Sequence, residues 1–174
     1  GDTPPVLIAL GAEITLRHGE RRRVIPLEDF FIAYGRQDRT PGEFVEAIAV
    51  PLPRPGQRDA AYKLSKRRDE DISSLAAGIS VTVSNGVISA CRIAFGGMAG
   101  TPKRALAVEE VLNAKPWCET AFPAAAERLP QDFTPLSDWR ASADYRMLAA
   151  RNLLRRFFLE HDNAGGEPVR LAVA

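Results

Sequence analysis

This sequence has few cysteines, no long apolar run and almost no net charge, and each of these features excludes a class of protein. Only two of the 174 residues are cysteine, Cys91 and Cys118, and their separation fits neither a metal site nor a redox motif. Two isolated thiols are typical of a reducing cytoplasm. No apolar run approaches the roughly 18 residues of a membrane span, and no signal peptide is visible. We therefore expect a cytoplasmic protein without a membrane partner.

The charged and catalytic residue types exclude further functions. Lysine and arginine number 23 against 22 aspartates and glutamates, so the net charge of +1 gives no general attraction to nucleic acid. His18 and His161 have no second ligand at metal spacing, so no metal site is expected. No Ser/His/Asp or Cys/His arrangement can be proposed, and the glycine-rich fingerprints of dinucleotide and triphosphate sites are missing. The pattern therefore indicates no catalytic side chain. The chain also begins abruptly at Gly1 rather than at Met, so we expect a piece of a longer polypeptide.

The first third of the chain alternates short strands with turns. Asp2 is placed to cap a short helix that has prolines in its first turn and ends before Gly11. Strand patterning follows at residues 12–17, 21–25 and 44–50, with a short helical turn at 26–31. The proline-rich stretch 51–56 is the best candidate for a boundary between two units.

The remaining chain predicts a small sheet covered by helices. A strand at 60–66 precedes two alternating runs, 78–84 and 87–95, joined by the hairpin signal Asn85-Gly86. Three helices are expected, at 103–113, 119–129 and 142–161. The last of these helices carries an apolar stripe, which we expect to pack on the hairpin. The stripe comprises Ala143, Met147, Ala150, Leu154, Phe157 and Phe158. The fold class is therefore α+β, with antiparallel strands and hairpins followed by a small sheet under three helices.

The charged stretch 63–73 is the leading candidate for a binding site. Lys63 lies at a strand position, and a dense run of cations and acids follows it. Fixed positive charge there could meet a pyrophosphate or the edge of a flavin. A solvated loop of ion pairs explains the same residues, and the pattern alone favours that alternative. Asp2 could likewise accept hydrogen bonds from a cofactor, although the helix cap is the stronger interpretation.

Four segments together resemble the C-terminal part of the FAD-binding subunit of xanthine dehydrogenases, with its carbon monoxide dehydrogenase-like flavoprotein C-terminal domain. The segments are Gly1–Pro5, Lys63–Ile72, Ile93–Lys103 and Gln131–Asp138. The resemblance implies an FAD-domain piece at 1–56, a C-terminal α+β domain at 57–163 and a tail at 164–174.

The resemblance also implies a cofactor, partners and site residues. FAD is the expected cofactor, and the molybdenum cofactor and 2Fe-2S clusters are expected elsewhere in the complex. The expected partners are a large molybdenum-binding subunit, an iron–sulfur domain and NAD as electron acceptor. Asp2, Val45 and Lys63 match flavin contacts of the family. The positions Arg67, Glu70 and Asp71 match a loop that lies over the flavin, whereas the family's main flavin-binding segments are not in this chain.

Two other functions stay open. As isolated, the chain could be a structural or docking module that binds no flavin. It could also belong to a sister flavoprotein that serves carbon monoxide, nicotine or aromatic thioester substrates.

Overall fold

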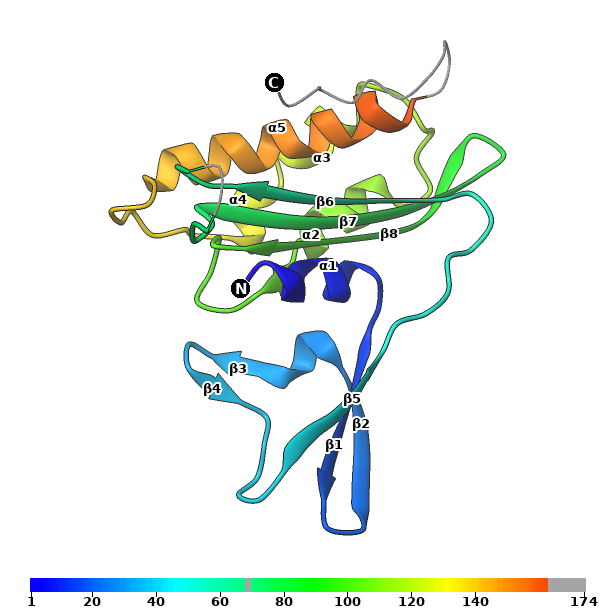
Figure 1. Ribbon diagram of the computed structural model, residues 1–174. Helices are drawn as coiled ribbons and strands as arrows, with labels where there is room; N and C mark the ends of the chain where they lie inside the picture. The colour runs from blue at the N-terminus through cyan, green and yellow to red at the C-terminus, as the bar shows by residue number, and fades with distance from the viewer. Residues whose placement is uncertain (68–69, 163–174) are drawn as a thin grey trace.

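The described residues form a four-stranded sheet, a smaller three-stranded sheet and a two-stranded hairpin, and the four-stranded sheet carries helices on both faces. The structure is a computed structural model that describes residues 1–67 and 70–162. Figure 1 shows the larger sheet with α5 on one side and α1 on the other, and the smaller sheet below α1.

The smaller sheet is formed by the first third of the chain. Its strand order is β2-β1-β5, with β1 antiparallel to both neighbours, and β3 and β4 form a separate two-stranded hairpin. The elements in chain order are α1 (Thr3–Ala9), β1 (Glu13–His18), β2 (Arg21–Pro26), the 3-10 helix η1 (Leu27–Phe30), β3 (Phe31–Ala33), β4 (Arg36–Gln37) and β5 (Phe44–Ala49). Ile14 and Leu16 alternate into a small core with Leu27 and Phe30, as the period of two requires.

The larger sheet is antiparallel, with strand order β6-β7-β8-β9. Its strands and the helices that follow are β6 (Gln57–Leu64), β7 (Leu75–Ser84), β8 (Val87–Gly96), β9 (Lys103–Arg104), α2 (Leu106–Leu112), α3 (Ala121–Ala126), α4 (Leu129–Asp132) and α5 (Ala143–His161). The β7–β8 turn has positive φ at both Asn85 (50°) and Gly86 (75°), as a type I′ hairpin requires. The hairpin prediction is confirmed.

The two faces of β7 have different residues and therefore different neighbours. Ile79 and Val81 belong to the main core, together with Leu154 and Phe157 of α5. The opposite face carries small residues, and a Cβ added at Gly78 would lie 2.5 Å from the Pro5 carbonyl oxygen. Helix α1 therefore rests directly on β7, and the start of α1 is brought to the edge of the larger sheet.

The predicted α+β class and the docking of the last helix on the hairpin are confirmed, and three local predictions need correction. The helix expected at 119–129 is broken into α3 and α4, because Pro130 has no amide proton to continue the hydrogen bonding of α3. The helix expected from Lys103 begins at Leu106, because residues 103–104 pair with β8 as β9. Asp2 makes no side-chain capping bond, since both Pro4 and Pro5 lack the amide that a cap would need.

The tail at 164–174 lies outside the described residues. Within residues 1–67 and 70–162, no helix combines the length and apolar character needed to cross a bilayer.

Candidate cofactor-binding site

Two of the predicted contacts, 61 positions apart in sequence, meet at the start of α1. Lys63 Nζ donates to Asp2 Oδ2 at 2.9 Å, and Ser73 Oγ donates to Asp2 Oδ1 at 2.5 Å. Lys63 reaches this position because β6 alternates, so Lys63 lies on the α1 side and Leu64 packs toward the main core. The side chains of Asp2 and Lys63 are each 43% exposed. We call Asp2, Lys63 and Ser73 the Asp2 cluster.

The electrostatics of the Asp2 cluster favour an ionised aspartate. Partial burial raises the pKa of the Asp2 carboxyl, but the hydrogen bonds from Ser73 and Lys63 and the charge of Lys63 outweigh it. The net pKa of Asp2 is lowered. Lys63 therefore does not act as an isolated cation, because a carboxylate that stays charged partly compensates it.

In the described part of the charged loop after β6, the carboxylate of Asp71 lies inward and its neighbours are exposed. Asp71 accepts from the amides of Arg67 and Ile72, both at 2.9 Å, and its side chain is only 8% exposed. The bond from the Arg67 amide lowers the pKa of Asp71. Arg67 and Glu70 are exposed, whereas Asp71 serves as the internal acceptor of the loop. A ligand lying over this loop would meet Arg67 or Glu70 before it met Asp71.

The structure does not bring Val45 to the Asp2 cluster. Val45 lies near the start of β5, opposite Leu16 of β1, and is 42% exposed. It therefore belongs to the smaller sheet, whereas Lys63 belongs to the larger one. Of the three flavin contacts implied by the family resemblance, Asp2 and Lys63 are adjacent and Val45 is separate.

Sequence reasoning missed two residues that organise this region. Ser73 was part of the charged stretch but received no role, although it donates to Asp2. Arg146 is 4% exposed and lies on the buried face of α5. The available signal was an arginine within the apolar stripe, three residues after Ala143 and four before Ala150, because a buried guanidinium requires hydrogen-bond acceptors nearby.

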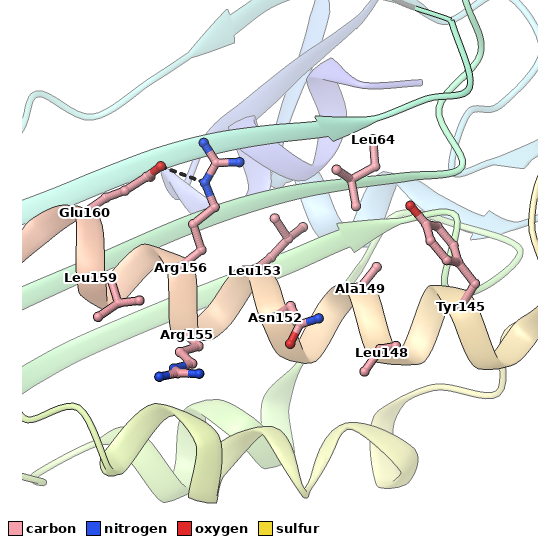
Figure 2. Close-up of a pocket in the computed structure, with 10 residues that line it drawn as sticks. All are labelled: Leu64, Tyr145, Leu148, Ala149, Asn152, Leu153, Arg155, Arg156, Leu159 and Glu160. Carbon is pink, nitrogen blue, oxygen red and sulfur yellow. Dashed lines mark hydrogen bonds and ion pairs between the residues drawn. The ribbon is translucent and has the colours of Figure 1, made fainter. Parts of the chain in front are cut away.

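An apolar groove lies between α5 and the edge strand β6. Its volume is about 540 Å³, and Figure 2 shows the side chains along it. They are Leu64, Tyr145, Leu148, Ala149, Asn152, Leu153, Arg155, Arg156, Leu159 and Glu160. Leu64 faces this groove and Lys63 faces the other way, so the groove and the Asp2 cluster lie on opposite sides of β6. Leu64 is the one member of the stretch 63–73 among these lining residues, and none of the individually predicted site residues is among them.

The Asp2 cluster fits part of an FAD molecule. A lysine ammonium has three donors, and one of them is directed at Asp2, which leaves donors for a carbonyl or ring nitrogen of a flavin. A half-exposed cation also suits a ring system that gains negative charge when it is reduced. The sequence has no glycine-rich phosphate loop, so the chain provides no comparable fit for the pyrophosphate. In the same described ranges, no group of three potential ligands is placed to hold a metal ion.

The α+β fold described above is matched by two known families. The family described as CO dehydrogenase flavoprotein C-terminal domain matches residues 60–161, and the one described as FAD binding domain in molybdopterin dehydrogenase matches residues 1–53. Because the first match covers more than half of the sequence, the chain belongs to the CO dehydrogenase flavoprotein C-terminal domain family.

Relatives with this segment have several names. The chain is 31% identical to nicotinate hydroxylase of Emericella nidulans over 90% of its own length and 12% of that protein. It is 30% identical to the carbon monoxide dehydrogenase medium chain of Afipia carboxidovorans, covering 89% of this chain and 54% of the relative. It is 28% identical to the xanthine dehydrogenase FAD-binding subunit of Escherichia coli O157:H7, covering 94% and 56%.

Solved structures support the same fold. Carbon monoxide dehydrogenase from Hydrogenophaga pseudoflava matches with a TM-score of 0.83 and 31% identity, covering 90% of this chain and 54% of that one. Quinoline 2-oxidoreductase from Pseudomonas putida matches with a TM-score of 0.78 at 23% identity, which supports the fold alone. The chain thus spans about half the length of its bacterial relatives.

Proposed function

We propose that this chain is part of the FAD-binding subunit of a molybdenum hydroxylase of the xanthine dehydrogenase type, where it helps to hold the flavin. The observation that carries the proposal is the Asp2–Lys63 ion pair, because two flavin-contact positions of the family become neighbours only in the folded chain. The matches to an FAD-binding domain and to the flavoprotein C-terminal domain support the same cofactor.

In this proposal each residue has a separate task. Lys63 provides the positive charge and the free donors at the flavin, Asp2 fixes the position of that ammonium, and Ser73 fixes Asp2. Arg67 and Glu70 form the exposed part of the loop that covers the site, and Val45 contributes an apolar contact from the smaller sheet. FAD, when bound, supplies the electron-transfer chemistry that the side chains of this chain lack.

The proposed partners follow from the same reading. Electrons pass from a molybdenum-binding large subunit through iron–sulfur clusters to the flavoprotein and on to NAD, in the cytoplasm. Names such as medium chain and FAD-binding subunit support a place among several polypeptides. The coverage of nicotinate hydroxylase, 12% of its length, supports the same segment within one much longer chain.

A sister enzyme is an equally good second candidate. Identity to nicotinate hydroxylase and to the carbon monoxide dehydrogenase medium chain, at 31% and 30%, is no lower than the 28% shared with the xanthine dehydrogenase subunit. Reduction of the assembled complex by a purine, by carbon monoxide or by nicotinate would separate these substrates, and adding NAD or oxygen would identify the acceptor.

The flavin itself is tested by absorbance of the purified intact complex. We expect a band at about 450 nm, the usual flavin absorbance, and a lower content of bound flavin in Lys63→Ala. Lys115→Ala is the matched control, because Lys115 is an exposed lysine beside the hairpin turn. A wild-type complex without flavin would favour a purely structural or docking role. A full flavin content in Lys63→Ala would return Lys63 to the class of solvated lysines.

A further inference from the structure

Three loops at one end of the larger sheet meet at a single buried side chain. The Arg146 guanidinium donates to the Ser74 carbonyl at very short range, to the Gly97 carbonyl at 2.9 Å and to Asp138 Oδ1 at 2.7 Å. Ser74 ends the charged loop, Gly97 follows β8, and Asp138 precedes α5. Two of the three acceptors are backbone carbonyls, so Arg146 holds the path of the chain as well as an opposite charge.

Gly97 has the backbone conformation that allows these three loops to meet. Its φ is +83°, in the left-handed region that favours glycine. A Cβ at this position would lie 2.7 Å from the Ser74 carbonyl oxygen and 2.9 Å from Arg146 Nη1. A side chain at position 97 would therefore push the loop end and the guanidinium apart.

The charged loop is tied down on both sides of this contact. Ser73, the residue before Ser74, donates to Asp2, and the Ser74 amide donates to the Leu64 carbonyl at 2.7 Å. Lys66 Nζ donates to the Trp139 carbonyl at 2.6 Å, which joins the same loop to the segment before α5. A shift of Ser74 would thus be transmitted to Ser73 and from there to Asp2.

We propose that Arg146 is a positioning residue for the Asp2 cluster. It holds the end of the charged loop, so that Ser73 keeps its bond to Asp2 and Asp2 keeps Lys63 in place. Arginine suits this task because its planar fork can serve several acceptors in different directions, whereas lysine presents a single ammonium group. The consequence for the flavin rests on the function proposed above.

Hydrogen–deuterium exchange on the intact protein tests the positioning role. In Arg146→Lys we expect the Ser74 amide to exchange about tenfold faster, while the Ile79 amide at the centre of β7 is unchanged. The reason is that the donors of an ammonium share one nitrogen, whereas Arg146 uses Nη1 for Ser74 and Gly97 and Nη2 for Asp138. Arg155→Lys is the matched control, since Arg155 lies on the same helix but pairs with Glu119. Unchanged exchange at Ser74, or equal acceleration at Ser74 and Ile79, would overturn the proposal.

A second variant protects the test against a folding failure. Asp138→Asn removes the charged partner of Arg146 at a residue on the surface, and we expect faster exchange at Ser74 there also. If Arg146→Lys does not fold, unchanged exchange at Ser74 in Asp138→Asn overturns the positioning role.

Flavin content measured on the same samples separates this inference from the proposed function. Faster exchange at Ser74 in Arg146→Lys, together with loss of flavin in both Arg146→Lys and Lys63→Ala, supports the positioning role and the proposed function. Faster exchange at Ser74 in Arg146→Lys with a full flavin content in both variants supports the tethering of the loop but contradicts the proposed function. Loss of flavin in Lys63→Ala alone shows that the loop does not act on the site, which overturns the positioning role and leaves the proposed function intact.

Discussion

At the scale of single residues, the Asp2–Lys63 pair changes what Lys63 contributes to a cofactor. Coulomb energy falls with distance, and the two opposite charges are 2.9 Å apart, so a group a few ångströms away experiences only part of the lysine charge. The aspartate thus sets the effective field of the site as much as the lysine does.

The charge balance predicts opposite effects of the two single substitutions. In the flavin-loaded intact protein, Lys63→Ala should lower the flavin reduction potential because it leaves a carboxylate unopposed. Asp2→Asn should raise it because the ammonium is then uncompensated, and the double variant should return close to wild type. Potentiometric titration measures the flavin reduction potential of the wild type, the two single variants and the double variant. Shifts of the same sign in both single variants would contradict this account.

The same pair predicts a pKa change that needs no flavin. Lys63 and Ser73 lower the pKa of Asp2 against the effect of its partial burial. Removing the ammonium in Lys63→Ala should therefore raise the pKa of Asp2, as followed by NMR titration of its carboxyl carbon. An unchanged pKa would show that the ion pair is absent in solution.

Phe157 is a buried aromatic residue whose loss should cost a large share of the stability. It is fully buried, with ring centroids of Trp117 and Phe122 at 6.1 and 6.0 Å. Truncation to alanine should lower the free energy of unfolding by about 3 kcal/mol, through lost burial and a residual cavity. Leu159→Ala, at a half-exposed position of the same helix, is the control and should cost under about 1 kcal/mol. Chemical denaturation measures the free energy of unfolding of both variants. Equal losses would show that Phe157 is not part of the core beneath α5.

At the scale of elements, a cluster of ion pairs joins the first third of the chain to the larger sheet. Glu28 of η1 accepts from Arg92 of β8 at 2.7 Å and from Arg104 of β9 at 3.3 Å. Arg92 also donates to the Ile8 carbonyl of α1 at 2.8 Å. Partial burial raises the pKa of Glu28, but the bond from Arg92 and the two arginine charges outweigh it and lower the pKa from its usual 4.5.

The lowered pKa gives a signed prediction for acid stability. A carboxyl whose folded pKa lies below its unfolded value stabilises the fold fully above the unfolded pKa, and that contribution is lost as pH falls below about 4.5 toward the folded value. Glu28→Gln should therefore be less stable than wild type at pH 7, and the difference should shrink in acid. Unfolding curves at several pH values measure it, with the exposed Glu13→Gln as control. A difference that is constant with pH would contradict the prediction.

At the scale of the whole molecule, the first third of the chain exposes several large apolar side chains. Val24, Phe44 and Ile48 on β2 and β5 are 56%, 51% and 47% exposed, and Tyr34 of the β3–β4 turn is 91% exposed. Contiguous exposed apolar patches mark contacts with proteins, membranes or ligands.

The incomplete fit predicts weak cofactor binding by these 174 residues alone. The Asp2 cluster can meet the flavin ring, but no glycine-rich loop is present for the pyrophosphate. Isothermal titration with FAD should therefore show binding weaker than about 1 μM, or none. Micromolar or tighter binding would show that the Asp2 cluster and its surroundings are sufficient.

The sequence by itself determined the features that depend on near neighbours. Asn85-Gly86 fixed the β7–β8 turn because both positions require positive φ, and the period of the apolar residues placed α5 on the sheet. The four segments that resemble the flavoprotein family are likewise short continuous stretches of the sequence. The absence of a cap at α1 is equally local, since Pro4 and Pro5 cannot donate.

Only the tertiary structure decided which distant residues became neighbours. Strand order and the small-residue face of β7 bring α1 onto the larger sheet, and this places Asp2 beside Lys63 and Ser73. Arg146 likewise meets its acceptors only after three loops converge. Such contacts depend on how the sheets and helices pack over tens of residues, and no local pattern of charge or hydrophobicity specifies that arrangement.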